Sequence, residues 1–194
     1  MVKHFGIKLN NSKDELKLTR ENYASLTNNK NTFRKNEVYS ELRCKKFYEE
    51  GIKNFDANMN KFSLINKDEF DSLVRLYIEQ YSQFKEIFDL NLYSGKSGYY
   101  IMVLDEYHQL YIGQSSDIKK RIMGHWNRKM PLDRLIFVGG VEGSILSIDS
   151  FRAFDTTRIF IYETEDFYKE EHKFIMGCPS KYRLNRVGGT IRTK

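Results

Sequence analysis

Two tyrosines, an arginine and a histidine follow one another at short spacing in the second half of the chain. Tyr100 falls in the run GYYIMVL and Tyr111 in the run LYIG, while Arg121 and His125 are four residues apart. On a helix, residues four apart lie on the same side, so these two side chains would be neighbours. A guanidinium that is always charged, beside an imidazole and two phenols, is suited to binding phosphate and handling protons.

The two tyrosine-containing runs are predicted to pair as a hairpin. Residues 98–104 and 110–113 are rich in β-branched and aromatic side chains, and the five residues between them suit a hairpin loop. Because side chains alternate along a strand, Tyr99 and Tyr100 are expected to point to opposite faces. Gly113 would let the chain turn from strand into helix.

A helix is predicted from residue 115 to about residue 129. The cap-type sequence Ser-Ser-Asp opens it. Ile118 and Ile122 are expected beside the arginine and the histidine, because residues three and four apart are neighbours on a helix. The predicted arginine–histidine pair therefore borders the buried stripe of this helix.

Glu171 is the acidic residue that most needs an explanation. It lies in a predicted helix over residues 165–176, with apolar side chains three and four residues away on both sides. The adjacent Glu170 has charged neighbours and is expected to face solvent. A carboxylate on an apolar stripe is costly unless it is paired or holds a metal. Glu171 is thus either the partner of Arg121 in an ion pair or an oxygen ligand for Mg²⁺.

The first half of the chain has a different composition from the second. Gly6 and Gly51 are the only glycines before residue 95, and the other ten of the 12 follow. Helices are predicted over residues 36–50, ending near Gly51, and 67–89, with Asn66 as the N-cap. We therefore expect a mostly helical region over residues 1–95, a linker near 91–97, and a second domain over 96–194.

The second domain is predicted to be α+β. Residues 158–163 are a strong candidate strand, and 135–138 and 144–148 are weaker ones. The order of strands and helices indicates a small mixed three-stranded sheet flanked by helices. Over residues 144–158, Asp149, Arg152, Asp155 and Arg158 alternate in sign, which indicates salt bridges within that segment.

Taken in order, these residues resemble the motifs of the GIY-YIG nuclease family. Gly98-Tyr99-Tyr100 stands where the family has GIY, with tyrosine in place of the middle isoleucine, and Tyr111-Ile112-Gly113 matches the second motif. Arg121 lies eight residues after the glycine of that motif, and His125 is placed as in the restriction-type members. The segment from Glu171 to Asn185 resembles the glutamate helix and closing asparagine of the family. The resemblance covers residues 98–187 and leaves the first 95 unexplained.

The resemblance implies a metal-dependent endonuclease that hydrolyses phosphodiester bonds in DNA with one Mg²⁺ ion, for which Mn²⁺ could substitute. Tyr100 would be the general base or would orient the attacking water, and Glu171 would bind the metal. Arg121 would stabilise the charge on the phosphate, with Tyr111 and His125 aligning base and water. An unperturbed tyrosine has a pKa near 10, so nearby cations must lower the pKa of Tyr100 if it is to act as a base.

Basic residues around these motifs are expected to contact the DNA backbone. The chain has 32 Lys and Arg against 26 Asp and Glu, and its isoelectric point is about 9.1. Such contacts should weaken steeply with salt. The candidate substrate-binding residues are Lys119, Lys120, Asn185, Lys181, Arg183 and Arg186.

Three functional alternatives remain open: a catalytically silent nucleic-acid-binding module, an RNA-cleaving nuclease of the same fold, and a plain interaction protein in which Glu171 pairs only with protein cations. A homodimer is an option, because cutting a duplex with one site requires two events or two copies. The low mean hydropathy of −0.61 and the lack of a long apolar run exclude a membrane span and favour a cytoplasmic protein. Cys44 and Cys178 are too few for a zinc knuckle.

Overall fold

The structure is a computed structural model that describes residues 1–10, 41–127 and 151–185. The chain divides into two compact units. The first contains Met1–Leu16, Ile65–Arg128 and Phe151–Lys194, and the second contains Lys17–Leu64 and Lys129–Ser150. The boundary expected near residue 95 lies inside the first unit, because the segment that precedes it contributes to the same hydrophobic core as the sheet.

The described part of the second unit is dominated by one helix, α2, which spans Glu41–Ser63. The prediction that a helix ends near Gly51 is wrong, since α2 continues through this glycine. A glycine inside a helix costs only about 0.5–1 kcal/mol relative to alanine. The residues that follow it, among them Ile52, Phe55 and Met59, keep the three- and four-residue apolar spacing that continues the helix.

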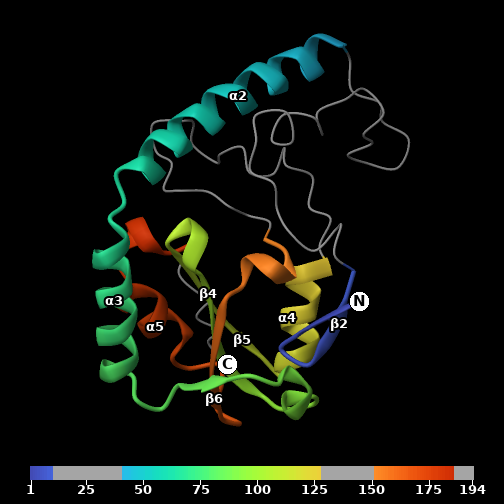
Figure 1. Cartoon of the computed structure of the whole chain (residues 1–194), viewed down its shortest axis with the longest axis vertical. Coiled ribbons are helices and arrows are strands. Elements are labelled where there is room, and N and C mark those ends of the chain that lie inside the picture. The colour runs from blue at the N-terminus through green and yellow to red at the C-terminus, as the bar shows by residue number, and fades with distance from the viewer. Residues whose placement is uncertain (11–40, 128–150, 186–194) are drawn as a thin grey trace. The chain divides into compact units, whose positions relative to one another are not determined.

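The first unit is built on a four-stranded sheet with the order β3-β6-β4-β5 (Figure 1). Its strands are β3 (Lys85–Ile87), β4 (Gly98–Leu104), β5 (Gln109–Ser115) and β6 (Arg158–Glu163). Each neighbouring pair is antiparallel. The α+β class and the predicted hairpin are confirmed, whereas the sheet has four antiparallel strands instead of three mixed ones. The candidate strands at 135–138 and 144–148 lie outside the described residues.

The fourth strand, β3, was missed because nothing in its own three residues, Lys-Glu-Ile, indicates a strand. It exists because it pairs with β6, with Glu86 opposite Phe160. The helical spacing of Tyr81, Phe84 and Phe88 predicted that the preceding helix would run to residue 89. Helix α3 instead spans Lys67–Gln80. Phe84 and Ile87 are buried beyond its end, while Phe88 is exposed.

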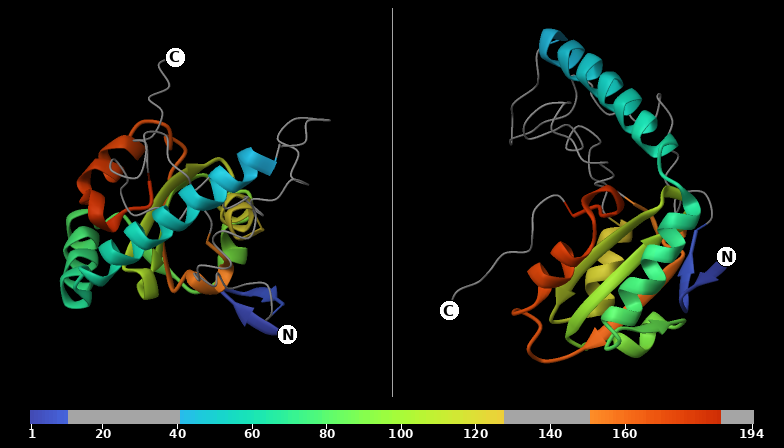
Figure 2. Two further views of the ribbon diagram at one scale, coloured as in Figure 1. Left: turned by 90° about the horizontal axis from the view of Figure 1, so that it is seen from above. Right: turned by 90° about the vertical axis from the view of Figure 1, so that its left-hand side faces the viewer.

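Helices cover both faces of the sheet. Helices α3 and α5 (Glu171–Gly177) lie on one face, and α4 (Ile118–Asn127) lies on the other (Figures 1 and 2). The core on the α3–α5 side is formed by Phe70, Val74, Tyr77, Tyr81, Phe84, Tyr99, Ile101, Val103, Leu110, Ile112, Phe160, Phe174, Ile175, Cys178 and Tyr182. Alternation along β4 therefore sends Tyr99 toward α5 and Tyr100 toward α4, as expected.

The helix ends follow local sequence only in part. The predicted cap of α3 is confirmed, since the Asn66 side chain accepts hydrogen bonds from the N–H groups of Asp68 (2.7 Å) and Glu69 (3.2 Å). Helix α4 lies within its predicted range. Helix α5, predicted from residue 165, begins only at Glu171, after a loop. Among the described residues, the larger elements are connected by the short 3₁₀ turns η1 (Leu90–Tyr93), η2 (Asp105–Tyr107), η5 (Ala153–Asp155) and η6 (Ser180–Tyr182).

An N-terminal hairpin of β1 (Val2–His4) and β2 (Ile7–Leu9) packs beside the end of α4 (Figure 1). The His4 ring lies 5.9 Å from the Trp126 ring, and its Nε2 is 2.7 Å from the carbonyl oxygen of Thr156. The Trp126 indole N–H donates to the Thr156 hydroxyl at 3.0 Å. The N-terminal hairpin and the segment before β6 therefore contact the last turn of α4, which follows His125.

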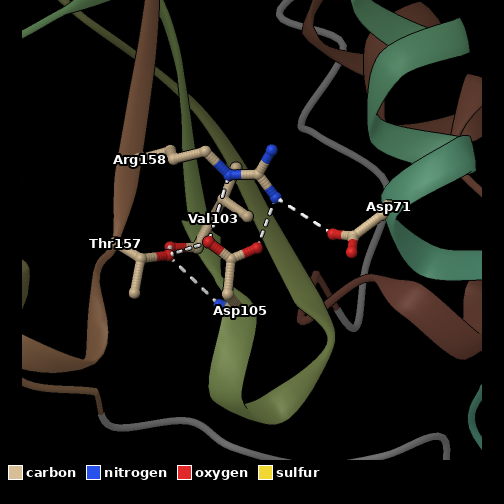
Figure 3. A network of polar contacts seen from close by, with 5 residues as sticks. All are labelled: Asp71, Val103, Asp105, Thr157 and Arg158. Atoms are coloured by element: carbon tan, nitrogen blue, oxygen red, sulfur yellow. Dashed lines mark hydrogen bonds and ion pairs between the residues drawn. The ribbon is translucent and has the colours of Figure 1, made fainter. Parts of the chain in front are cut away.

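In the described part of the chain, Arg158 pairs with acids outside the segment 144–158, in which the salt bridges were predicted. At the start of β6, its guanidinium binds the Asp105 carboxylate and lies 3.6 Å from Asp71 on α3 (Figure 3). The Thr157 hydroxyl also donates to Asp105, at 2.6 Å. This network joins the tip of the β4–β5 hairpin to β6.

None of the helices in the described part of the chain is long and apolar enough to cross a membrane.

Candidate functional site

Tyr100 and His125 form a buried polar pair between the sheet and α4. The phenol oxygen of Tyr100 and Nε2 of His125 share a hydrogen bond of 2.8 Å. Tyr100 is fully buried and His125 is 8% exposed. The two residues are 25 apart in the chain and come together because β4 sends alternate side chains toward α4. The predicted association of these two side chains is present.

Tyr111 completes an aromatic cluster around this pair. Its ring centroid is 4.7 Å from that of His125 and 6.3 Å from that of Tyr100. Tyr111 reaches this face because it is opposite Met102, two residues further along β4 than Tyr100. Sequence reasoning missed Phe151, whose ring stacks on His125 at 5.6 Å. No motif marks this residue, and only the folding of the segment before β6 brings it here.

Arg121 connects the buried pair to solvent. The residue is exposed overall, and the phenol oxygens of Tyr100 and Tyr111 lie within electrostatic reach of its guanidinium. Burial opposes its charge, but these two oxygens outweigh that effect and raise the pKa of Arg121. The guanidinium is therefore a fixed positive charge that can still bind an anion from solvent.

Glu171 lies at the start of α5 and is partly buried. Burial raises the pKa of its carboxyl, against the opposing effects of Arg121 and of a hydrogen bond from the Gln114 backbone. Among the described residues, no ion pair within 4 Å joins Glu171 to Arg121. The sequence left two explanations open for Glu171. The first, an ion pair with Arg121, is therefore not found among the described residues.

The electrostatic environment of Tyr100 differs from the one that a tyrosine base requires. Burial and the neighbouring Tyr111 raise the pKa of Tyr100 far above its ordinary value, and Arg121 lowers it by less. Glu171 raises it further, which also places this carboxylate within electrostatic reach of the phenol. The phenol is accordingly protonated at neutral pH in the protein as it stands.

Asn185 lies beside β5, next to the second motif. Its side-chain Nδ2 donates to the Ile112 carbonyl at 2.7 Å, and its Oδ1 accepts from the Ile112 N–H at 3.0 Å. The residue is 8% exposed. Both polar groups of the side chain are thus used to bind the strand that carries Tyr111.

The other predicted substrate-binding residues are dispersed. Lys119 donates to Asn91 at 2.8 Å, and Lys120 is exposed on α4. Lys181 pairs with Glu69 at 3.1 Å, and Arg183 donates to the Ile175 carbonyl at 2.6 Å. These last two engage α3 and α5, away from the tyrosine–histidine cluster. Arg186 lies outside the described residues.

The donor groups at this site fit one kind of metal binding. In the described part of the chain, no three His, Cys, Asp or Glu side chains gather as a metal cage. Mg²⁺ usually keeps several waters and is held by one or two carboxylates together with substrate phosphates. The Glu171 carboxylate next to Arg121 supplies this minimal set of ligands, so the residues fit Mg²⁺ bound jointly with a phosphate.

Tyr100, Tyr111 and His125 thus meet on one face of the sheet, with Arg121 and Glu171 within electrostatic reach of them. They combine an exposed cation, a partly buried carboxylate and a hydrogen-bonded phenol–imidazole pair. Comparisons of the chain with protein-family models, with curated proteins and with solved structures find no match.

Proposed function

We propose that this protein is a metal-dependent endonuclease that hydrolyses phosphodiester bonds in DNA. The observation that carries the proposal is the juxtaposition of Arg121 and Glu171. Arg121 is exposed and lies within electrostatic reach of two phenols, and Glu171 is partly buried without an ion-pair partner within 4 Å among the described residues. A phosphate bound to the guanidinium would bring its oxygens toward this carboxylate.

Arg121 is the phosphate-binding residue. The phenol oxygens of Tyr100 and Tyr111 lie within electrostatic reach of the guanidinium and favour its charged form before any substrate arrives. A preorganised cation stabilises the charge that develops on a phosphate in the transition state without a cost of reorganisation. Tyr111 orients the guanidinium and packs against His125.

Tyr100 and His125 together handle the proton. Since burial keeps the Tyr100 phenol protonated, the phenol alone is a poor base. Its hydrogen bond to Nε2 of His125 offers the phenol proton an acceptor, so the two side chains can take a proton from the attacking water as a unit. Phe151 stacks on the imidazole and restricts its orientation.

Glu171 would hold Mg²⁺, or Mn²⁺ in its place. The ion would supply positive charge next to the scissile phosphate and the nucleophile. The Glu171 carboxylate is suited to this role because it is partly buried and has no ion-pair partner within 4 Å among the described residues. Asn185 acts as a positioning residue through its two bonds to Ile112.

The DNA backbone is expected to contact the exposed side of α4. Lys119 and Lys120 precede Arg121 in the first turn of α4, and such cations attract a polyanion. Binding should therefore weaken as salt is raised. Lys181 and Arg183 are engaged elsewhere, so they are weaker candidates for substrate contact.

The proposal extends to the finer description of the fold. The three strands β5-β4-β6, with α4 and α5 on opposite faces, resemble a GIY-YIG domain, to which β3 would be an addition. The features that support this resemblance are Gly98-Tyr99-Tyr100 and Tyr111-Ile112-Gly113, which lie on paired strands. A homodimer would place two such sites on one duplex.

The test is the cleavage of supercoiled plasmid with Mg²⁺ by the wild type, Glu171→Ala and Glu170→Ala. Glu170 is the matched control, because it is the adjacent acid and already pairs with Lys173 at 2.7 Å. Nicking or linearisation by the wild type and Glu170→Ala, with at least about 100-fold less by Glu171→Ala, would support the proposal. Equal activity of all three proteins would reject the role of Glu171.

The same preparations separate the alternatives. Single-stranded and duplex RNA are incubated in parallel with the plasmid, and cleavage of RNA alone would replace DNA as the substrate. Salt-sensitive DNA binding without cleavage in Mg²⁺ or Mn²⁺ would identify a silent binding module. Light scattering of the protein with and without a duplex tests for the dimer.

A further inference from the structure

The hydroxyl group of Tyr99 organises the loop that leads into α5. Tyr99 is fully buried on the α5 side of β4. Its oxygen accepts hydrogen bonds from the backbone N–H groups of Lys169 (3.1 Å) and Glu170 (2.9 Å), and it donates to the carbonyl of Asp166 (3.1 Å). One phenol thus makes three bonds to a single loop.

The loop does not supply these bonds itself. Residue 170 is the N-cap of α5, and its side chain makes no capping hydrogen bond. The first N–H groups of a helix need acceptors from outside the helix, which Ser, Thr, Asp or Asn usually provide at this position. Here Tyr99, about 70 residues earlier in the chain, provides the acceptor for the N–H of Glu170.

The aromatic surroundings of Tyr99 restrict its ring. It stacks on Tyr162 with centroids 5.8 Å apart, and its edge meets Phe174 of α5 at 5.0 Å. A ring packed on two sides within the core has little freedom to follow a moving loop. The loop must therefore conform to the hydroxyl position that β4 determines.

We propose that Tyr99 is a positioning residue, whose hydroxyl holds the 166–170 loop so that Glu171 faces Arg121. This inference rests on the proposed function. Tyr99 does not touch the Tyr100–His125 pair, since the two neighbouring tyrosines point to opposite faces of β4. One residue of the first motif would thus serve the proton-handling pair and the next would serve the carboxylate.

The experiment compares Tyr99→Phe with Tyr77→Phe. Both changes remove one buried phenol oxygen that bonds α5 or its approach. Tyr77 donates to the Phe174 carbonyl at 2.6 Å, in the middle of α5 and away from the loop. Tyr77→Phe is therefore matched in chemistry and in the helix concerned, and it differs because it removes support from the middle of α5 and not from the loop before it.

Two sets of measurements are made on each protein. The first is hydrogen exchange at the Lys169 and Glu170 amides, without metal or DNA. The second is plasmid nicking, resolved into kcat and KM, together with the Mg²⁺ concentration for half-maximal rate. We expect Tyr99→Phe to speed exchange of these amides by at least about tenfold. Its kcat should fall about 10- to 100-fold and its Mg²⁺ requirement should rise, with KM for DNA little changed.

Tyr77→Phe should leave these two amides and kcat within about twofold of the wild type, even where it lowers the melting temperature as much. Equal effects of the two substitutions on kcat and on Mg²⁺ requirement would overturn the proposal, because they would reflect general loss of stability. If the Lys169 and Glu170 amides of the wild type exchange as fast as those of an unprotected chain, the proposal is also overturned, whether or not Tyr99→Phe folds.

Failure of the proposed function is distinguishable from failure of this inference. If the wild type cleaves no nucleic acid in Mg²⁺ or Mn²⁺, the nuclease assignment fails. Exchange protection at residues 169 and 170 that depends on Tyr99 and not on Tyr77 would then still support the positioning of the loop, and its absence would reject it.

Discussion

The ring of Tyr100 lies across Gly113 on the neighbouring strand. A Cβ atom at residue 113 would lie 2.4 Å from both Cζ and the phenol oxygen of Tyr100. The two residues are register partners, so the tyrosine ring occupies the space that a side chain opposite it would fill. The glycine of the second motif is therefore required by the position of the tyrosine in the first.

Gly113→Ala should displace the Tyr100 ring and weaken its hydrogen bond to His125. We expect a loss of stability of about 1–3 kcal/mol, because the ring is fully buried and cannot move without disturbing its neighbours. Urea unfolding measures this change. Gly124→Ala is the control, since a Cβ there meets nothing within 4 Å, and it should stabilise α4 by about 0.5–1 kcal/mol. A neutral Gly113→Ala would show that Tyr100 adapts freely.

Tyr100 and His125 should be energetically coupled. Tyr100→Phe removes the phenol partner of the imidazole, which lies 2.8 Å away, and should cost about 1–2 kcal/mol. In a His125→Phe background the same change should cost much less, because the hydrogen bond is already lost. A double-mutant cycle by urea unfolding gives the coupling. Strictly additive effects would mean that the two side chains act independently.

Asn185 should be important for stability as well as activity. Asn185→Ala leaves both the N–H and the carbonyl of the buried Ile112 without the partners that the amide provides. The cost should be about 1–3 kcal/mol for each unsatisfied group that water cannot reach. Faster hydrogen exchange at the Ile112 amide is the direct readout. Asn185→Asp should also fall short of the stability of the wild type, because a carboxylate has no donor for the Ile112 carbonyl.

The Arg158 network should be carried by Asp105 and not by Asp71 (Figure 3). Arg158 makes two hydrogen bonds to Asp105, which also accepts from Thr157, whereas Asp71 is half exposed and lies 3.6 Å from the guanidinium. Asp105→Asn should cost about 1–2 kcal/mol in urea unfolding. Asp71→Asn should cost less than about 0.5 kcal/mol, and this cost should vanish in 1 M salt. The reverse ranking would contradict the observed geometry.

Cys178 should resist alkylation in the folded protein. Burial raises the pKa of this thiol from 9.0 to about 12, with Arg183 opposing the shift. At pH 8 only about one thiol in 10,000 would then be ionised. In a Cys44→Ser variant, iodoacetamide labelling should be at least about 100-fold slower before than after urea unfolding. Rapid labelling of the folded variant would show that Cys178 is accessible.

The same shift has a consequence for stability at high pH. Folding raises the pKa of Cys178. The contribution of the thiol to the free energy of unfolding is therefore complete below pH 9 and is lost as the pH rises toward 12. The difference in unfolding free energy between the wild type and Cys178→Ala should therefore be constant from pH 6 to 8 and shrink above pH 9. A constant difference up to pH 11 would contradict the burial of the thiol.

Local sequence was sufficient to predict the elements that make up the site. Alternating aromatic and β-branched residues indicated the β4–β5 hairpin, and the four-residue spacing of Arg121 and His125 placed both on α4. Apolar neighbours singled out Glu171 over Glu170. These features are encoded within a few residues of each other, because the repeats of strands and helices are short.

The tertiary structure decided how those elements are used. The pairing that creates β3, the three bonds from Tyr99 to the loop before α5, and the amide of Asn185 on Ile112 each join residues 67 or more positions apart. Packing also raised the pKa of Tyr100, where the arginine alone would lower it. Burial and desolvation depend on every element that surrounds a group, and no local pattern in the chain specifies that environment.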